Sequence, residues 1–174
     1  MADIELSLKE RLFLSIQLRI LEKLSPDEAE SLATWRKAID EGYSLHYGDF
    51  DGWILDELDK EGCREVLDIL EMHSRLLDGY NQLKDKTGID PDKLKFLGFD
   101  GNDEGQYLGY AQYFIRDKDR YNELKDAGDG LNSHGPFLQV YRRMLKVWRP
   151  LKDKYPLSKD DIQAIIAARP HPGN

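Results

Sequence analysis

The stretch FDGNDEGQYLGY, residues 99–110, carries oxygen-bearing side chains at a spacing that could begin a calcium-binding loop. An EF-hand loop takes side-chain oxygens at positions 1, 3 and 5, a glycine at position 6 and a bidentate glutamate at position 12. Counted from Asp100, Asn102 and Gly105 fit positions 3 and 6, but position 12 is an alanine, which offers no oxygen. We therefore predict no metal site here, and expect Asp100 or Asn102 to cap a helix N-terminus. Glu104, in the first turn of that helix, is expected to interact favourably with its dipole.

Two glycines in the helix expected at residues 103–116 call for an explanation. Gly105 and Gly109 lie four residues apart, on the side opposite Tyr107 and Tyr110. A glycine in an exposed helix costs ~1 kcal/mol relative to alanine, so the pair predicts close approach of another backbone or a ligand. Packing within the chain is the first interpretation, and a contact between subunits or with a ligand is the second. We take the two glycines as candidate interface residues and the two tyrosines as candidate ligand-binding residues.

The histidines form no recognisable catalytic or metal-binding motif. His73 lies on the apolar face of the helix expected at residues 60–86, with no second histidine four residues further along. A hydrogen-bonded core histidine is the first interpretation, and a general base or metal ligand is the alternative. His134 lies in the glycine-rich loop KDAGDGLNSHG, residues 125–135, which lacks the P-loop pattern and is either a lid or a plain connection. We keep both histidines as candidate ligand-binding residues, and predict no catalytic constellation, metal site or cofactor.

Helix signals occur throughout the chain, and no alternating strand pattern is present. Serine-led capping boxes at residues 7–10, 25–28 and 158–161 mark three helix starts. We predict an all-α fold, a single-domain bundle of about five to seven helices with irregular connecting loops. The domain would span residues 1–174, with a short disordered-like tail at 169–174. Helices are expected over residues 7–24, 25–42, 60–86, 103–116, 136–149 and 158–168.

The first helix is apolar around more than half of its circumference. A surface helix of a globular domain needs one apolar stripe about 100° wide. Leu14, Leu18 and Leu21 form one row on this helix. If Leu12 and Ile16 face the core, that row is exposed in a monomer. We therefore predict a homo-oligomer with the row at its interface, and the competing interpretation places the helix at the centre of its own domain.

The overall charge weighs against nucleic acid as a partner. The 174-residue chain carries 25 Lys and Arg and 33 Asp and Glu, which gives a formal net charge of −8. Such a surface repels phosphate backbones and anionic membranes. Arg142, Arg143, Lys146 and Arg149 form a basic stripe on one predicted helix. We expect these side chains to be solvated and paired with local acids, and an anionic partner is the alternative.

The sequence also gives expectations about the compartment. It contains no apolar run of the ~18 to 20 residues that span a membrane. Its N-terminus, MADIELSLKE, lacks the pattern of a signal peptide. The single cysteine, Cys63, is expected to be a small core residue. We therefore expect a cytoplasmic protein with no membrane partner.

Five segments resemble one known protein family. They are EGYSLHY, DILEMH, KFLGFD, QYLGYAQYF and YRRMLKVW, and their order and spacing are similar to those of the YfbU-like family of uncharacterised bacterial proteins. The resemblance runs from about Lys9 to Ala167. It implies a mostly helical, cytoplasmic and self-associating protein, and it carries over no catalytic residue.

Two hypotheses of function from different classes follow. The first is a non-enzymatic oligomeric interaction or regulatory protein. It would associate with copies of itself, and an unidentified protein could be a further partner. This hypothesis depends on the missing catalytic constellation and on the apolar first helix. The alternative is a small hydrolase or ligand-sensing protein with a site near His73, Tyr107 and the 125–135 loop. Convergence of those groups in one pocket would favour the alternative.

Overall fold

The computed structural model describes residues 4–49, 57–127, 129–152 and 154–169. It divides into two compact units, Met1–Glu57 and Leu58–Asn174, and each is described here by itself. The described residues contain helices and two isolated β-bridges but no strand, so the predicted all-α fold is confirmed. Six α-helices are present among them, within the expected number. The single domain expected over residues 1–174 stays a prediction.

The N-terminal unit is a helical hairpin. It comprises α1 (Leu8–Leu24), a 3-10 turn (Pro26–Glu28), α2 (Ala29–Glu41) and a second 3-10 turn (Ser44–His46). The predicted capping box of α1 is present, because the Ser7 hydroxyl accepts from the Glu10 N–H and the Glu10 carboxylate accepts from the Ser7 N–H. The second predicted box is wrong. Ser25 makes no side-chain cap, because the residues after it form the 3-10 turn before α2 begins.

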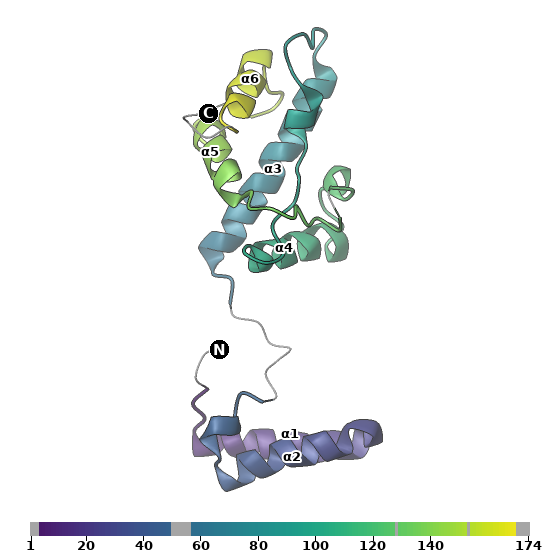
Figure 1. Ribbon diagram of the computed structural model, residues 1–174, viewed down its shortest axis with the longest axis vertical. Helices are drawn as coiled ribbons and strands as arrows, with labels where there is room; N and C mark the ends of the chain where they lie inside the picture. Colours follow the sequence, from purple (N-terminus) through teal and green to yellow (C-terminus); the bar gives the residue numbers. More distant parts are fainter. Residues whose placement is uncertain (1–3, 50–56, 128, 153, 170–174) are drawn as a thin grey trace. The chain divides into compact units, whose positions relative to one another are not determined.

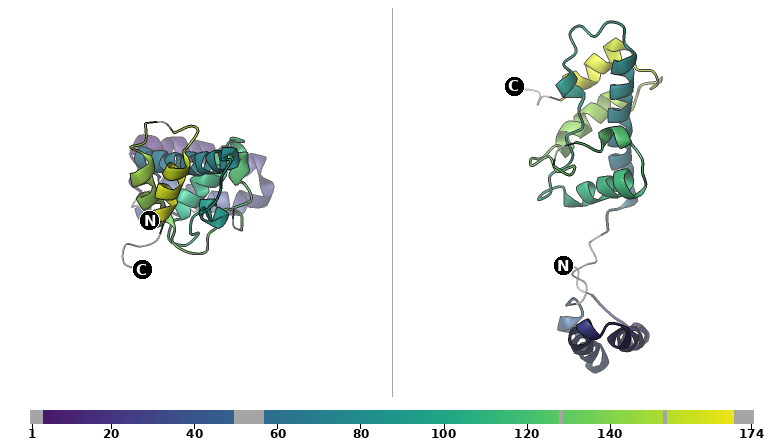
Figure 2. Two further views of the ribbon diagram at one scale, coloured as in Figure 1. Left: turned by 90° about the horizontal axis from the view of Figure 1, so that it is seen from above. Right: turned by 90° about the vertical axis from the view of Figure 1, so that its right-hand side faces the viewer.

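Helix α2 runs back alongside α1, and Figure 2 shows the two side by side, nearly end-on. A small apolar cluster between them contains Leu18, Leu32, Ile39 and Tyr47. Arg11 on α1 reaches the C-terminal end of α2, where its guanidinium donates to the Ile39 carbonyl at 2.8 Å. The contact between the two helices is thus partly apolar and partly polar.

The C-terminal unit is built around the long helix α3 (Lys60–Gln82). Around it lie α4 (Gly105–Gln112), α5 (Leu138–Trp148) and α6 (Lys159–Ala167), with 3-10 turns at Pro91–Leu94 and Asn122–Leu124 (Figure 1). Helix α3 ends earlier than expected because Leu83 adopts an extended conformation. The helix expected at 103–116 divides into α4 and a π-helical turn at Tyr113–Asp117.

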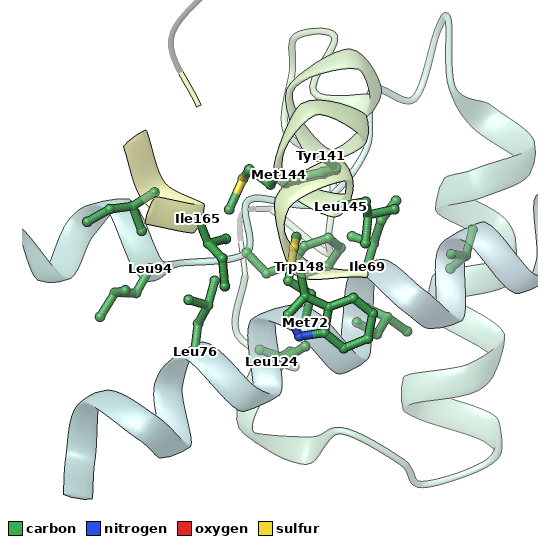
Figure 3. Packing of buried hydrophobic residues seen from close by; sticks show 14 of the residues in the cluster. Ile69, Met72, Leu76, Leu94, Leu124, Tyr141, Met144, Leu145, Trp148 and Ile165 are labelled. Carbon is green, nitrogen blue, oxygen red and sulfur yellow. The ribbon is translucent and has the colours of Figure 1, made fainter. Parts of the chain in front are cut away.

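The core of this unit lies between α3, α5 and α6. Figure 3 shows side chains from α5 facing those from α3, with Ile165 of α6 beside them. All of these side chains are buried. They are Tyr141, Met144, Leu145 and Trp148 on α5, and Ile69, Met72 and Leu76 on α3.

The segment before α4 crosses this core as an irregular strand-like stretch. The Tyr141 hydroxyl accepts a hydrogen bond from the Leu97 N–H and donates one to the Gly98 carbonyl, each at 3.0 Å. Phe99 then pairs with the 125–135 loop, donating from its N–H to the Leu131 carbonyl at 3.0 Å. Gly98 has a φ of +91°, and a Cβ placed on it would lie 1.8 Å from the Leu131 oxygen. This position therefore requires glycine.

The C-terminal end of the described chain is held against the same unit. The Arg143 guanidinium donates to the Ala168 and Arg169 carbonyls at 3.3 and 2.6 Å, which satisfies the end of α6. The Arg169 guanidinium donates in turn to the Lys93 and Lys95 carbonyls. Of the tail expected at 169–174, Arg169 is described, and 170–174 lie outside the described residues. No helix in the described part of the chain is long and apolar enough to cross a membrane.

Candidate functional site

In the stretch 99–110, the carboxylates of Asp100 and Glu104 accept hydrogen bonds from backbone N–H groups. Asp100 is buried, and its Oδ1 accepts from the N–H groups of Asn102 and Asp103 at 2.7 and 3.3 Å. Asp100 therefore caps the turn that precedes α4, whereas α4 itself begins after Glu104 without a side-chain cap. The prediction that Asp100 or Asn102 caps the helix is therefore wrong, because the capped N–H groups belong to the turn before it.

Glu104 acts on a different helix from the one expected. Its buried carboxylate accepts from the Asp100 N–H at 3.0 Å, and from the N–H groups of Phe137 and Leu138 at 3.4 and 2.7 Å. The Phe137 and Leu138 N–H groups lie at the start of α5, so Glu104 caps α5. Its carboxylate therefore links the stretch before α4 to α5. Among the described residues, no group of three or more His, Cys, Asp or Glu side chains could hold a metal ion.

His73 is buried in the core, as the sequence predicts. Its Nδ1 lies 2.9 Å from the Leu94 carbonyl oxygen, and its ring packs against those of Phe96 and Tyr141. Burial lowers the pKa of His73 to about 4, and the hydrogen bond to the Leu94 carbonyl opposes this shift. The imidazole is therefore neutral at pH 7. Its Nε2 is buried without a hydrogen-bond partner among the described residues.

The groups expected to form a ligand site do not meet in one pocket. Tyr107 is separated from His73 by the rings of Phe99 and Tyr141, whose centroids lie 5.6 Å apart. His134 is exposed, with its Nε2 3.9 Å from the Asp129 carboxylate. Tyr110, the remaining candidate, packs on the aromatic residues that follow it in the chain, Tyr113 and Phe114. Only Tyr107 of these candidates lines the pocket described next.

A polar pocket of about 690 Å³ opens at the start of α3. Tyr107 reaches it from α4, Arg142 from α5, and Arg149 from the C-cap of α5. Its remaining walls come from the first turns of α3. The lining residues of this polar pocket are Asp59, Glu61, Gly62, Arg64, Glu65, Asp68, Tyr107, Arg142 and Arg149.

Two arginine–carboxylate pairs lie in the polar pocket. Arg142 donates from Nε and Nη2 to the two carboxylate oxygens of Glu65, at 2.9 and 2.8 Å. The Tyr107 hydroxyl donates to the same carboxylate at 3.1 Å. Arg149 pairs with Asp68 at 2.8 Å. Two members of the predicted basic stripe are thus paired with local acids, as expected.

This pairing fixes the protonation states in the polar pocket. The hydrogen bonds from Arg142 lower the pKa of Glu65, so that its carboxylate stays ionised. Burial, and then the bond to Glu65, raise the pKa of Tyr107, so that its hydroxyl stays protonated. Neither group is poised to exchange a proton near pH 7, which is what a general acid or base requires. The arrangement therefore stabilises the contact between α3, α4 and α5.

Helix α1 packs with Leu18 facing α2, which is the opposite of the orientation in which Leu12 and Ile16 face the core. Leu18 is 8% exposed and packs on α2, whereas Leu12 and Ile16 are 60% and 47% exposed. Polar side chains on the Leu18 side explain this orientation, because they find partners on α2. Arg11 binds the Ile39 carbonyl, Glu22 binds Arg36 at 2.5 Å, and Ser15 hydrogen-bonds Asp40. We call the opposite, exposed side the outer face of α1: Leu8, Leu12, Phe13, Ile16, Ile20 and Leu24.

The leucines predicted at an interface lie beside this outer face. Leu14 and Leu18 are mostly covered by α2, and Leu21 is 41% exposed. All three line an apolar groove of about 630 Å³ between α1 and α2. The other residues lining this groove are Gln17, Glu28, Ser31, Leu32 and Trp35. Their place at a subunit interface stays a prediction.

Packing within the unit does not account for the two glycines of α4. A Cβ placed on Gly105 or Gly109 would meet no heavy atom within 4 Å. Close packing inside the C-terminal unit therefore does not explain these glycines. Their part in an interface stays a prediction.

The acids of the polar pocket are not among the site residues predicted from the sequence. Glu65 and Asp68 lie three residues apart on one helix, and Arg142 and Arg149 lie seven apart on another. These spacings put each pair on one face of its helix, which is a usable signal. The sequence does not say which two helices face each other, and the pairing depends on that.

The family comparison covers both units. A model of the family described as the YfbU domain matches residues 4–168 of the 174-residue chain. The match includes α1 and α2 as well as the core around Tyr141 and the stretch that holds Glu104. The chain belongs to the YfbU family.

Proposed function

We propose that this chain is a non-enzymatic, self-associating interaction protein, and that copies meet through the outer face of α1. One observation carries the proposal, the uneven distribution of exposed large apolar side chains. Seven of them lie on α1 alone, the six of the outer face and Leu21, and two more follow α2. In the described part of the larger C-terminal unit, only Tyr113 and Tyr155 are comparably exposed.

The apolar area on α1 is of the size that a stable interface buries. Taking roughly 200 Å² for a fully exposed large apolar side chain, the exposed fractions on α1 amount to about 800 Å² per copy. A standard specific interface buries about 800 Å² on each partner. Contiguous apolar patches on soluble monomers are usually smaller, at ~300 to 600 Å².

The N-terminal unit also gains from a partner because its own core is small. Four side chains form its buried apolar cluster, around which a few others pack. Burying each leucine, isoleucine or phenylalanine of the outer face would contribute ~1.5 to 3 kcal/mol of hydrophobic free energy. A second copy presents the same surface, and closed two-fold pairing is the commonest way in which identical chains cover such a face.

The competing hypothesis, a hydrolase or ligand sensor, has less support. The separation of His73 and His134 from Tyr107 counts against a shared catalytic site. The settled protonation states of Glu65 and Tyr107 count against proton transfer in the polar pocket. A cytoplasmic location, expected from the sequence, stays a prediction.

Size-exclusion chromatography with light scattering tests the proposal. We expect the wild-type protein at micromolar concentration to have a mass well above the 20.2 kDa of one chain. Ile16→Glu places a charge at the centre of the outer face and should give a helical monomer. Lys37→Glu, on the exposed surface of α2, is the matched control and should leave the mass unchanged. A wild-type mass of 20.2 kDa defeats the proposal.

A further inference from the structure

We infer that two copies of α1 pair antiparallel about a two-fold axis at Ile16. This inference rests on the proposed function and adds the orientation and register of the contact. Five residues of the outer face recur every four positions, and Ile16 is the middle one. They are Leu8, Leu12, Ile16, Ile20 and Leu24. Residues four apart lie one above another on a helix, so they form a continuous ridge along α1.

The flanking charges have the same symmetry as the ridge. Lys9 and Lys23 each lie seven residues from Ile16, in the first and last turns of α1. The Lys9 side chain lies over the Phe13 ring, 6.0 Å from its centroid. On a helical wheel of ~100° per residue, both lysines fall within the apolar arc. An antiparallel pair centred on Ile16 brings Lys9 of one copy level with Lys23 of the other. These like charges repel, so the lysines mark the ends of the apolar centre and do not add to the attraction.

A helix with this pattern presents nearly the same surface when it is turned end over end. In an antiparallel pair centred on Ile16, Leu12 of one copy lies opposite Ile20 of the other, and Ile16 meets its own equivalent. Every contact except that of Ile16 with its equivalent then occurs twice, which makes the interface closed and limits the assembly to two α1 helices at this face. The two acidic residues of α1, by contrast, are already engaged inside each hairpin, Glu22 with Arg36 and Glu10 with the backbone of Ser7.

Two physical arguments favour antiparallel over parallel pairing. The helix macrodipoles of α1 attract when they run in opposite directions and repel when they run in the same direction. Phe13, the bulkiest residue of the outer face, lies nearly one turn before Ile16. In a parallel pair, the two Phe13 rings lie at the same height along the helices. In an antiparallel pair, one ring lies above the two-fold axis and the other below it, so that side chains of different size alternate along the contact.

Each pairing predicts a different set of close residues. Packed helices lie ~8 to 10 Å apart between axes, so Cα atoms that face each other across the axis come within reach of a disulfide. In the antiparallel pair, Ile16 is close to its equivalent. Leu12 is offset from its own equivalent by about 12 Å along the helix, at 1.5 Å per residue, but faces Ile20 of the second copy.

Single-cysteine crosslinking in the full-length chain tests this register. The background variant is Cys63→Ser, which removes the one native thiol, located in the C-terminal unit. Ile16→Cys, Leu12→Cys and Ile20→Cys are oxidised singly, and the last two are also oxidised as a mixture. Lys37→Cys measures random collision. Light scattering and circular dichroism on the reduced proteins confirm assembly and helicity before oxidation.

We expect Ile16→Cys to form disulfide dimers, and the mixture to form a mixed disulfide several-fold more than either of its components forms alone. Homodimers of all three variants, with no gain in the mixture, would overturn the antiparallel register and leave self-association standing. No crosslink in a protein that light scattering shows to be dimeric would overturn both the register and the place of α1 in the proposed function. A monomer would overturn the proposed function itself.

Discussion

The neutral imidazole of His73 should make the protein lose stability as the pH falls below neutrality. Burial lowers the pKa of His73 to about 4 in the folded chain, whereas the usual pKa of a free histidine is 6.5. Between these values the unfolded chain binds a proton that the folded chain does not. Because a proton bound only by the unfolded state favours unfolding, the free energy of unfolding falls as the pH falls from about 6.5 to about 4.

The size of this effect follows from the two pKa values. They differ by 6.5 − 4, or about 2.5, and each pKa unit corresponds to ~1.4 kcal/mol. The full loss below pH 4 is therefore roughly 3 kcal/mol, and the loss between pH 7 and pH 5 is roughly 2 kcal/mol. Among the described residues, the ring contacts the Leu94 carbonyl and the rings of Phe96 and Tyr141, and the positive charge of Arg169 lowers the pKa of His73 further.

Urea unfolding at pH 7 and pH 5, followed by circular dichroism, measures this loss. His73→Phe keeps an aromatic ring at the position but cannot titrate, so its loss over that interval should be smaller than that of the wild type by roughly 2 kcal/mol. His134→Gln is the matched control, because His134 is exposed and should not carry the effect. The same pH dependence in the wild type and in His73→Phe would refute the reasoning.

Three further substitutions test the stretch before α4 and α4 itself, each by urea unfolding at pH 7. Gly98→Ala should cost ~2 to 4 kcal/mol, because its Cβ would overlap the Leu131 carbonyl at a positive φ; a loss below ~1 kcal/mol would contradict this account. Glu104→Gln should cost ~1 to 3 kcal/mol, because an amide has one acceptor oxygen where the carboxylate now accepts from three backbone N–H groups, two of them in buried bonds; an unchanged midpoint would show that Glu104 does not cap α5. Gly109→Ala should stabilise the chain by ~0.5 to 1 kcal/mol, because its Cβ meets nothing; a drop in the mass measured by light scattering would instead place α4 at a subunit contact.

Local signals in the sequence predict the helices well. The capping boxes led by Ser7 and Ser158 are both formed, because each depends on residues only three apart. The box led by Ser25 fails for a reason that is equally local, since the residues from Pro26 onward take a 3-10 turn first. The all-α fold follows from such signals, because most of the described chain lies in elements that caps and periodicity define.

The face that a helix turns toward the core is harder to predict, because it depends on contacts with residues far away in the sequence. A helical wheel shows two apolar arcs on α1 and gives no reason to prefer one as the inner arc. The polar side chains decide it: Arg11 and Glu22 lie beside Leu18, and both are satisfied by α2. The role of Glu104 is hard to predict for the same reason. The sequence favours an interaction of its carboxylate with the dipole of the helix expected at 103–116. In the structure it caps α5, more than thirty residues away.

The family segments can now be assigned physical roles within the C-terminal unit. KFLGFD contains Gly98, whose backbone passes against the Leu131 carbonyl. YRRMLKVW contributes Tyr141, whose hydroxyl holds that same backbone, and DILEMH contributes the buried His73. These roles concern packing and hydrogen bonding, and none of them requires a ligand.

The outer face of α1 is different, because no contact within the hairpin covers it. Its six apolar side chains lie on the side of the helix away from α2 and are exposed. A sequence that only needed to form the hairpin could have polar residues there at no cost to the contact between α1 and α2. The apolar residues Leu12, Ile16 and Ile20 therefore support the contact that we propose between copies of this chain, because a second copy presents the same surface.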